Sequence, residues 1–359
     1  MRPLPMMNLK RLSNPAGLLS VLFLIKKTLA GWSNPPAADA RWPTKGWRTS
    51  SPEEQGLDSQ KIAQMLAVIQ KQNLDFHSFL IIRNGCLVSE TYFGAYQQNT
   101  QHNLYSCTKS FTSTLIGIAL DKGYIPRIDQ PVVDFFPGYT FANLDGQKQS
   151  LTLEHVLTMR SGLDWDEGDP IYQEMRQSQD WVQYVLDKPM GSPPGSQFNY
   201  NSGGSHLLSA ILQQATGMNP RDFAEQYLFQ PLGISDAAWE ANAAGIPVGG
   251  WGLQLAPREM AKLGYLYLRN GLWEGKQIVS AQWVKIATQH HTKTYDDMSL
   301  GYGYHWWTVP SLSAYEALGR YGQMILVIPG SDLVIVTTAG MENYDGTYQL
   351  IEQYIVPAA

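Results

Sequence analysis

The chain has only two cysteines, Cys86 and Cys107, in 359 residues. Two cysteines cannot form the disulfide framework of a small secreted fold, so they leave the redox compartment undecided. The seven histidines show no His-x-x-x-His or His-Glu-x-x-His spacing, which argues against a zinc site. Neither Gly-x-Ser-x-Gly nor a P-loop or Gly-x-Gly-x-x-Gly motif is present. We therefore expect no metal, no cofactor and no α/β-hydrolase chemistry.

Clusters of basic residues and long apolar runs are scarce as well. The formal charge is −5 without a Lys/Arg cluster, so no nucleic-acid partner is expected. Residues 17–25 form an apolar stretch between basic pairs, as in a secretory signal, but no clear cleavage site follows. The stretch is too short for an ordinary spanning helix. We interpret residues 1–32 as a signal or an N-terminal anchor with peripheral membrane association; export or anchoring and a cytoplasmic location both stay open.

The remaining composition is that of a globular protein, with 44% hydrophobic and 16% charged residues. Asn84-Gly85 separates two runs rich in apolar and β-branched residues, 78–83 and 86–93. Asn-Gly between such runs is the strongest short-range signal for a β-hairpin. The sequence therefore predicts an antiparallel sheet that begins near residue 78.

Helical patterns dominate the middle of the chain, from about residue 105 to 255. Strand patterns return near the end, at residues 302–308, 323–328 and 333–338. Strands at both ends with helices between them predict an α/β (α+β) fold in which an antiparallel sheet is flanked by helices. We assign residues 33–104 and 256–359 to this domain, and residues 105–255 to an inserted all-α domain.

Ser106-Cys107-Thr108-Lys109 opens an apolar helical run that extends to residue 120. A spacing of three places the hydroxyl and the amine on one helical face. Such a pair suits nucleophilic catalysis, in which the serine attacks a carbonyl and the lysine handles its proton. Cys107 would point about 100° away from Ser106, so we prefer a buried structural role to a reactive thiol. Because a lone Ser-x-x-Lys arises by chance, its weight depends on other motifs.

Two further motifs follow in the chain. Tyr200-Asn201-Ser202 lies on a short loop before an apolar helix, where a tyrosine can project its hydroxyl into a cleft. Residues 319–327 read as a strand whose glycine, Gly322, lets a substrate approach the backbone closely. Taken singly, these residues would be a helix cap, a solvated lysine and a core tyrosine. Their combination and order favour catalysis.

With these motifs, the sequence resembles the serine β-lactamase-related superfamily, in its branch of class C enzymes, family VIII-type esterases and 6-aminohexanoate-dimer hydrolases. The likeness covers roughly residues 45–355 and includes residues 157–165, 228–234 and 250–253. It implies a β-lactamase/transpeptidase-like fold. It also implies that Ser106 is the nucleophile, Lys109 and Tyr200 its catalytic partners, and the backbone N–H groups of Ser106 and Gln323 the oxyanion hole.

Three positions depart from the pattern that this resemblance implies. Ser202 stands where β-lactamases carry an asparagine, Arg320 replaces a lysine, and Tyr321 replaces a small hydroxyl residue. These residues and Gly322 are expected to bind the substrate, and the bulk of Tyr321 narrows the cleft. Arg320 either binds a substrate carboxylate or pairs with an acid. The departures favour an ester or amide over a β-lactam.

The sequence thus predicts a cofactor-free serine hydrolase, a carboxylesterase or amidase that forms an acyl-enzyme at Ser106. Its partner is a small ester or amide substrate. A β-lactamase or D-Ala-D-Ala-type peptidase is one alternative, and a non-catalytic peptide-binding protein of the same fold is another. Whether Lys109 or Tyr200 takes the serine proton is left open. The oligomeric state is not predicted.

Overall fold

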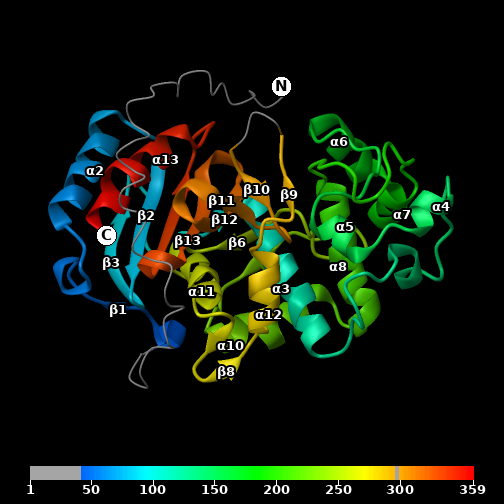
Figure 1. Cartoon of the computed structure of the whole chain (residues 1–359), viewed down its shortest axis with the longest axis horizontal. Helices are drawn as coiled ribbons and strands as arrows, with labels where there is room; N and C mark the ends of the chain where they lie inside the picture. Colours follow the sequence, from blue (N-terminus) through cyan, green and yellow to red (C-terminus); the bar gives the residue numbers. More distant parts are fainter. Residues whose placement is uncertain (1–41, 296–298) are drawn as a thin grey trace.

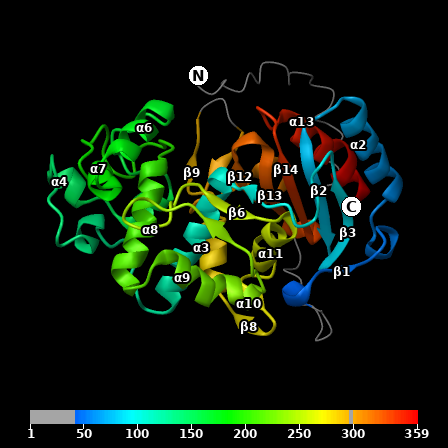
Figure 2. The same cartoon turned by 180° about the vertical axis from the view of Figure 1, so that it is seen from behind.

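The computed structural model describes residues 42–295 and 299–359. Its centre is a nine-stranded sheet with the order β1-β3-β2-β14-β13-β12-β11-β10-β9 (Figures 1 and 2). Neighbouring strands are antiparallel except β1, which pairs with β3 in parallel. Strands from both ends of the chain join in this sheet, so the predicted fold class is confirmed. The strands are β1 Arg48–Thr49, β2 Phe76–Arg83, β3 Cys86–Tyr92, β9 Thr292–Lys293, β10 Gly301–Tyr302, β11 Trp307–Val309, β12 Ala314–Gly319, β13 Gln323–Ile328 and β14 Leu333–Ala339.

The predicted hairpin is confirmed as β2 and β3. Asn84 and Gly85 both have positive φ, 51° and 75°. Two such residues form the tight turn whose twist matches that of antiparallel strands. Gly85 also lies against α11 (Pro257–Leu268), since a Cβ there would be 2.5 Å from the Tyr265 hydroxyl. Glycine is therefore required at this turn for both backbone conformation and space.

The sheet is buried on both faces, because alternate side chains enter two separate cores. Leu80 and Ile82 of β2 belong to the core shared with α11 and the helical region. Phe79 and Ile81 belong to the core beneath α2 (Ser59–Lys71) and α13 (Asp345–Leu350). Figures 1 and 2 show α2 and α13 together on one side of the sheet. The sheet is therefore a central layer between two layers of helices.

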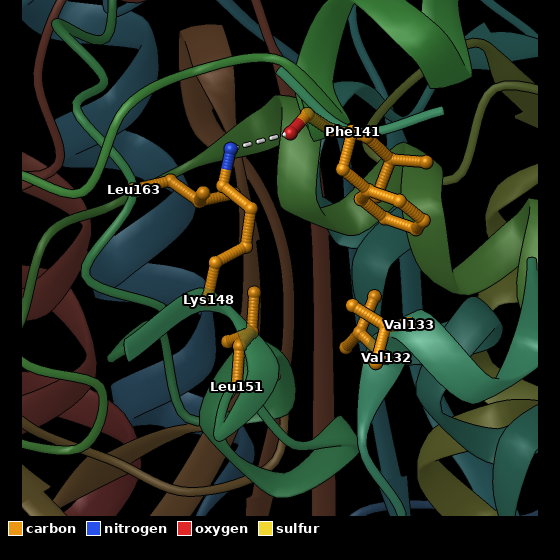
Figure 3. Close-up of a pocket in the computed structure, with 7 residues that line it drawn as sticks. Val132, Val133, Phe141, Lys148, Leu151 and Leu163 are labelled. Carbon is orange, nitrogen blue, oxygen red and sulfur yellow. Dashed lines mark hydrogen bonds between the residues drawn. The ribbon is translucent and has the colours of Figure 1, made fainter. Parts of the chain in front are cut away.

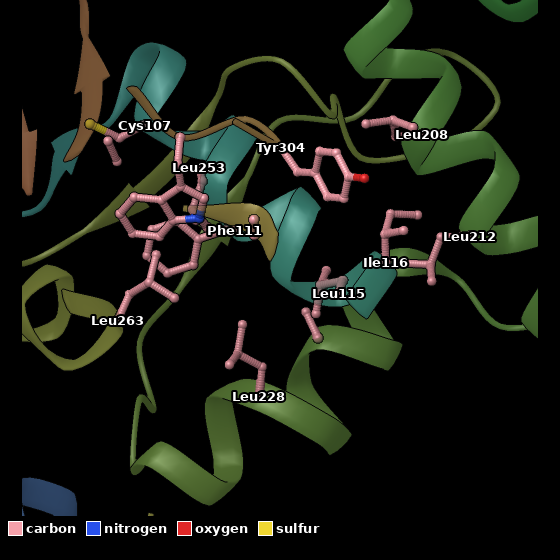
Figure 4. Close-up of a cluster of buried hydrophobic side chains, with 14 of the residues drawn as sticks. Cys107, Phe111, Leu115, Ile116, Leu208, Leu212, Leu228, Leu253, Leu263 and Tyr304 are labelled. Atoms are coloured by element: carbon pink, nitrogen blue, oxygen red, sulfur yellow. The ribbon is translucent and has the colours of Figure 1, made fainter. Parts of the chain in front are cut away.

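The helical region is built around α3 (Thr108–Asp121), which is buried along nearly its whole length. Its apolar side chains pack against α8 (Ser202–Thr216) and neighbouring segments, as Figure 4 shows for Ile116, Leu208 and Leu212. The other helices are α4 Gly146–Gln149, α5 Leu153–Leu157, α6 Asp169–Gln177, α7 Trp181–Leu186, α9 Pro220–Ala224, α10 Gln230–Leu232 and α12 Ala281–Ala287.

Hydroxyl groups fix α3 to the chain around it. Ser110 and Ser113 donate to the carbonyls of His305 and Tyr304, each at 2.6 Å. Thr112 donates to the carbonyl of Gly249 at 2.9 Å. These bonds satisfy polar groups that would otherwise be costly to bury. They also set the position of α3 along its axis.

A small sheet that the sequence did not predict accompanies the helices. Its strands are β4 (His102–Asn103), β6 (Leu253–Leu255) and β5 (Ala238–Trp239), paired in that order. β4 lies just before the predicted boundary at residues 104/105 and β6 just before the one at 255/256, so the chain enters and leaves the helical region at neighbouring points. The division into residues 33–104, 105–255 and 256–359 stays a prediction.

The predicted signal or anchor at residues 1–32 lies outside the described residues. Within the described ranges, no helix combines the length and apolar character needed to cross a bilayer.

A pocket in the helical region contains a buried lysine with a structural role. Lys148 donates to the carbonyls of Ala142 at 2.7 Å and Leu186 at 2.8 Å. Figure 3 shows Lys148 among the apolar side chains of the pocket, with a hydrogen bond from its ammonium group. Its ammonium group thus joins the turn at Ala142 to the C-terminal end of α7. The pocket is lined by Val132, Val133, Phe141, Lys148, Leu151, Leu163 and Leu186.

Candidate active site

Ser106 lies on a short 3-10 turn, Tyr105–Cys107, directly before α3. The sequence predicted that the α-helix begins at Ser106, and this boundary is wrong. Tyr105 has a φ of +45°, and its N–H donates to Asn103 Oδ1 at 2.9 Å, so the backbone bends before the helix starts. The turn leaves Ser106 partly exposed at the positive end of α3.

Cys107, the neighbour of Ser106, is fully buried. Burial raises the pKa of its thiol well above the usual value, which disfavours the reactive thiolate. Its Sγ donates to the carbonyl of Gln323 at 3.4 Å. Cys107 therefore contacts the start of β13 and is poorly suited to act as a nucleophile.

Lys109 is buried in the site, with 1% of its surface exposed. Its Nζ donates to Ser106 Oγ at 3.0 Å, Ser202 Oγ at 2.9 Å and the carbonyl of Gly250 at 2.9 Å. Burial lowers its pKa to about 8, although the charge of Glu167 opposes this effect. At pH 7 about a tenth of Lys109 is thus neutral, far more than an exposed lysine would be.

Tyr200 lies on the loop before α8, and its phenol is near enough to Ser106 for the serine side chain to lower the pKa of the phenol against the larger effect of burial. Its ring centroid is 4.6 Å from Lys109 Nζ. Burial, followed by the neighbouring Tyr302 and Glu167, raises the pKa of Tyr200 well above its usual value. The ring also stacks on Trp307 with centroids 5.9 Å apart. Tyr200 is therefore held as a neutral phenol beside the serine.

Ser202 contacts two residues that the sequence did not single out, Glu167 and Tyr172. The Ser202 hydroxyl donates to Glu167 Oε1 at 2.5 Å, and its backbone N–H donates to Oε2 at 3.0 Å. Trp165 Nε1 donates to Oε2 at 2.6 Å, and the Tyr172 hydroxyl donates to Oε1. Glu167 lies 35 residues before Ser202, so no local spacing could have joined them.

Arg320, Tyr321 and Gly322 form the turn between β12 and β13, where the sequence predicted a continuous strand. Tyr321 and Gly322 have φ values of +66° and +88°, which end the strand pairing. The Tyr321 ring meets Tyr105 edge to face, with centroids 5.3 Å apart. The exposed Arg320 guanidinium lies 4.9 Å from the Tyr321 ring centroid. This turn therefore reaches the neighbour of Ser106.

Gln323, the first residue of β13, is 2% exposed. Its side-chain amide donates to the carbonyls of Arg320 at 3.0 Å and Ala339 at 2.8 Å. These bonds fix the strand end beside the serine turn. The contact is close, because a Cβ on Gly319 would lie 2.0 Å from the Leu104 carbonyl oxygen.

A serine, a depressed-pKa lysine and a neutral phenol in mutual contact define the class of serine hydrolases, and the comparisons with known proteins agree. The β-lactamase family profile matches residues 53–347. The 6-aminohexanoate-dimer hydrolase of Paenarthrobacter ureafaciens is 25% identical over 296 residues, which cover 75% of this chain and 73% of that protein. The chain therefore belongs to the β-lactamase family, as the resemblance indicated.

Solved structures share the fold. A Bacillus anthracis protein assigned as a 6-aminohexanoate-dimer hydrolase superposes with a TM-score of 0.72 at 21% identity, covering 90% of this chain and 89% of its own. A family VIII carboxylesterase superposes with a TM-score of 0.68 at 16% identity, covering 83% of this chain and 96% of its own. At these identities the likeness supports the fold alone.

Proposed function

We propose that this protein hydrolyses a carboxylic ester or amide through an acyl-enzyme at Ser106. The observation that carries the proposal is the contact of 3.0 Å between Ser106 Oγ and Lys109 Nζ, whose pKa is lowered to about 8 by burial. A neutral amine at this distance is a competent general base. Tyr200, whose pKa is raised, stays protonated at neutral pH and so has no free site for the serine proton. We therefore assign the serine proton to Lys109.

In the acylation step, the proton of Ser106 passes to Lys109 Nζ while Oγ bonds to the substrate carbonyl carbon. The backbone N–H groups of Ser106 and Gln323 stabilise the resulting oxyanion. The intermediate collapses as the bond to the leaving group breaks. The leaving group takes a proton from Tyr200, which recovers one from Lys109. Water then attacks the acyl group by the same route and frees Ser106.

The substrate class rests on the relatives and on the turn at Arg320–Gly322. Relatives are described as a dimer hydrolase and a carboxylesterase, which act on an amide and an ester. We propose that Arg320, Tyr321 and Gly322 contact the substrate, whereas Ser202, which is 1% exposed, contacts Glu167 and Lys109 instead. Tyr321 and Tyr105 together add bulk on one side of Ser106. An extended ester or amide suits this side better than a fused β-lactam ring.

Mass spectrometry of trapped acyl-enzyme tests the proposal. The protein is mixed with p-nitrophenyl butyrate, an aryl amide and nitrocefin, and Ser106→Ala serves as the control. We expect an acyl adduct on Ser106 from the ester or amide and none in the variant. An adduct from nitrocefin alone would favour a β-lactamase. No adduct and no turnover with any compound would favour a non-catalytic binding protein.

A further inference from the structure

We infer that Glu167 is a positioning residue: it fixes the hydroxyl proton of Ser202, and thereby aims the free electron pair of Lys109 at Ser106. The inference rests on the proposed function, because it assigns Lys109 as the base. It concerns a residue that belongs to none of the three sequence motifs.

The carboxylate of Glu167 has its hydrogen-bonding capacity filled. Oε1 accepts from the hydroxyls of Ser202 and Tyr172, and Oε2 accepts from the Ser202 N–H and from Trp165 Nε1. An ionised carboxylate offers about four acceptor positions. No position is left for a substrate ammonium group. Glu167 therefore acts through its protein partners.

An ionised carboxylate cannot donate, so the only hydroxyl proton of Ser202 points at Glu167. The distance of 2.5 Å marks a strong charge-assisted hydrogen bond. With its proton committed, Ser202 Oγ can only accept on its other side. That side faces Lys109 Nζ at 2.9 Å. The Tyr172 hydroxyl is also 3.2 Å from Ser202 Oγ, but its proton is donated to Glu167, so Lys109 is the nearer donor to Ser202.

This fixed direction matters when Lys109 is neutral. A neutral amine has two N–H bonds and one electron pair. Ser202 Oγ and the carbonyl of Gly250, each 2.9 Å away, accept both N–H bonds. The electron pair is then left for Ser106 Oγ at 3.0 Å. If the Ser202 hydroxyl were free to rotate, it could donate to that same electron pair and compete with Ser106.

The test compares Glu167→Gln, Glu167→Asp and Ser202→Ala by steady-state kinetics across pH. Asp166→Asn is the matched control, since it removes the same charge from the exposed neighbouring residue. We expect Glu167→Gln to lower kcat by up to about 100-fold through lost alignment, with KM changed less than about threefold. Its acid limb of kcat/KM should move to lower pH, because the charge of Glu167 raises the pKa of Lys109.

The other variants separate orientation from charge. Glu167→Asp keeps the charge and should keep the acid limb near that of the wild type. Ser202→Ala keeps Glu167 but removes the oriented acceptor, so kcat should fall. The double variant Glu167→Gln/Ser202→Ala should be no slower than Ser202→Ala alone, because both changes break the same chain of hydrogen bonds from Glu167 through Ser202 to Lys109. Thermal unfolding of each variant shows whether it is folded.

The inference would be overturned if folded Ser202→Ala kept the kcat of the wild type. It would also be overturned if the acid limb of kcat/KM moved equally in Glu167→Gln and Asp166→Asn. Additive losses in the double variant would overturn it as well. Failure of the proposed function looks different, since the wild-type protein itself would then form no acyl adduct at Ser106.

Discussion

The buried ammonium group of Lys109 should weaken the fold at neutral pH. Its pKa is about 8 in the folded chain against an ordinary 10.5, so the unfolded chain binds this proton more tightly. Such a group costs stability below pH 8, and the cost fades as the pH rises from 8 towards 10.5. The difference between these two pKa values corresponds to a loss of about 3 kcal/mol of folding stability at pH 7. About 2 kcal/mol of this should disappear between pH 7 and pH 9.5.

Lys109→Met removes the titrating group and isolates this effect. The variant also leaves the carbonyl of Gly250 without its donor, but that loss does not depend on pH and cancels between two pH values. Urea unfolding of wild type and variant at pH 7 and pH 9.5 measures the difference. We expect the wild type to gain about 2 kcal/mol relative to the variant over this range. A constant difference would refute the assigned pKa.

The chain supplies its own control in Lys148. Burial lowers the pKa of this lysine as well, yet it donates only to backbone carbonyls. The difference in unfolding free energy between the wild type and Lys148→Met should therefore change with pH in the same direction as for Lys109→Met. Ester turnover should persist in Lys148→Met and be lost in Lys109→Met. Loss of turnover in a folded Lys148→Met would contradict a purely structural role.

Ser106→Ala should abolish acylation while changing the free energy of unfolding by less than about 1 kcal/mol, because it removes one partly exposed hydroxyl; calorimetry and adduct mass measure both. The kcat/KM of the wild type should rise with pH through about 8, as neutral Lys109 becomes available; a limb near pH 5 would contradict the assignment. Tyr200→Phe should lower kcat by about 100-fold or more, measured with an ester that has a poor leaving group. Asn201→Ala should cost about 1 kcal/mol in urea unfolding, since Asn201 Oδ1 caps α8 by accepting from the Gly204 N–H at 2.7 Å.

Local signals in the sequence were sufficient for several elements. The hairpin at Asn84-Gly85 is set by two residues that adopt positive φ readily, so the pattern predicted both strands. A spacing of three likewise brings Lys109 to Ser106 even though the serine lies on a 3-10 turn. In both cases the interacting residues are near in the chain.

Elements that depend on distant contacts were missed. β12 was not predicted, because Ala314–Gly319 contains alanine, glutamate and leucine, which favour helices. Burial between β11 and β13 overrides that preference. It also raises the pKa of Glu316 to about 8, with Tyr348 donating a hydrogen bond to its carboxyl group. Glu167 was missed for the same reason, since only the folded chain brings it to Ser202.

The hydroxyl bonds that fix α3 have a consequence for how this enzyme diversifies. Ser110, Thr112 and Ser113 bond to two separate stretches of surrounding backbone, at residues 304–305 and at Gly249. Sliding α3 to suit a new substrate would break all three bonds together. Substrate selectivity must therefore evolve in the peripheral turns, such as the one that carries Arg320 and Tyr321. The positions of the nucleophile and its lysine then stay unchanged.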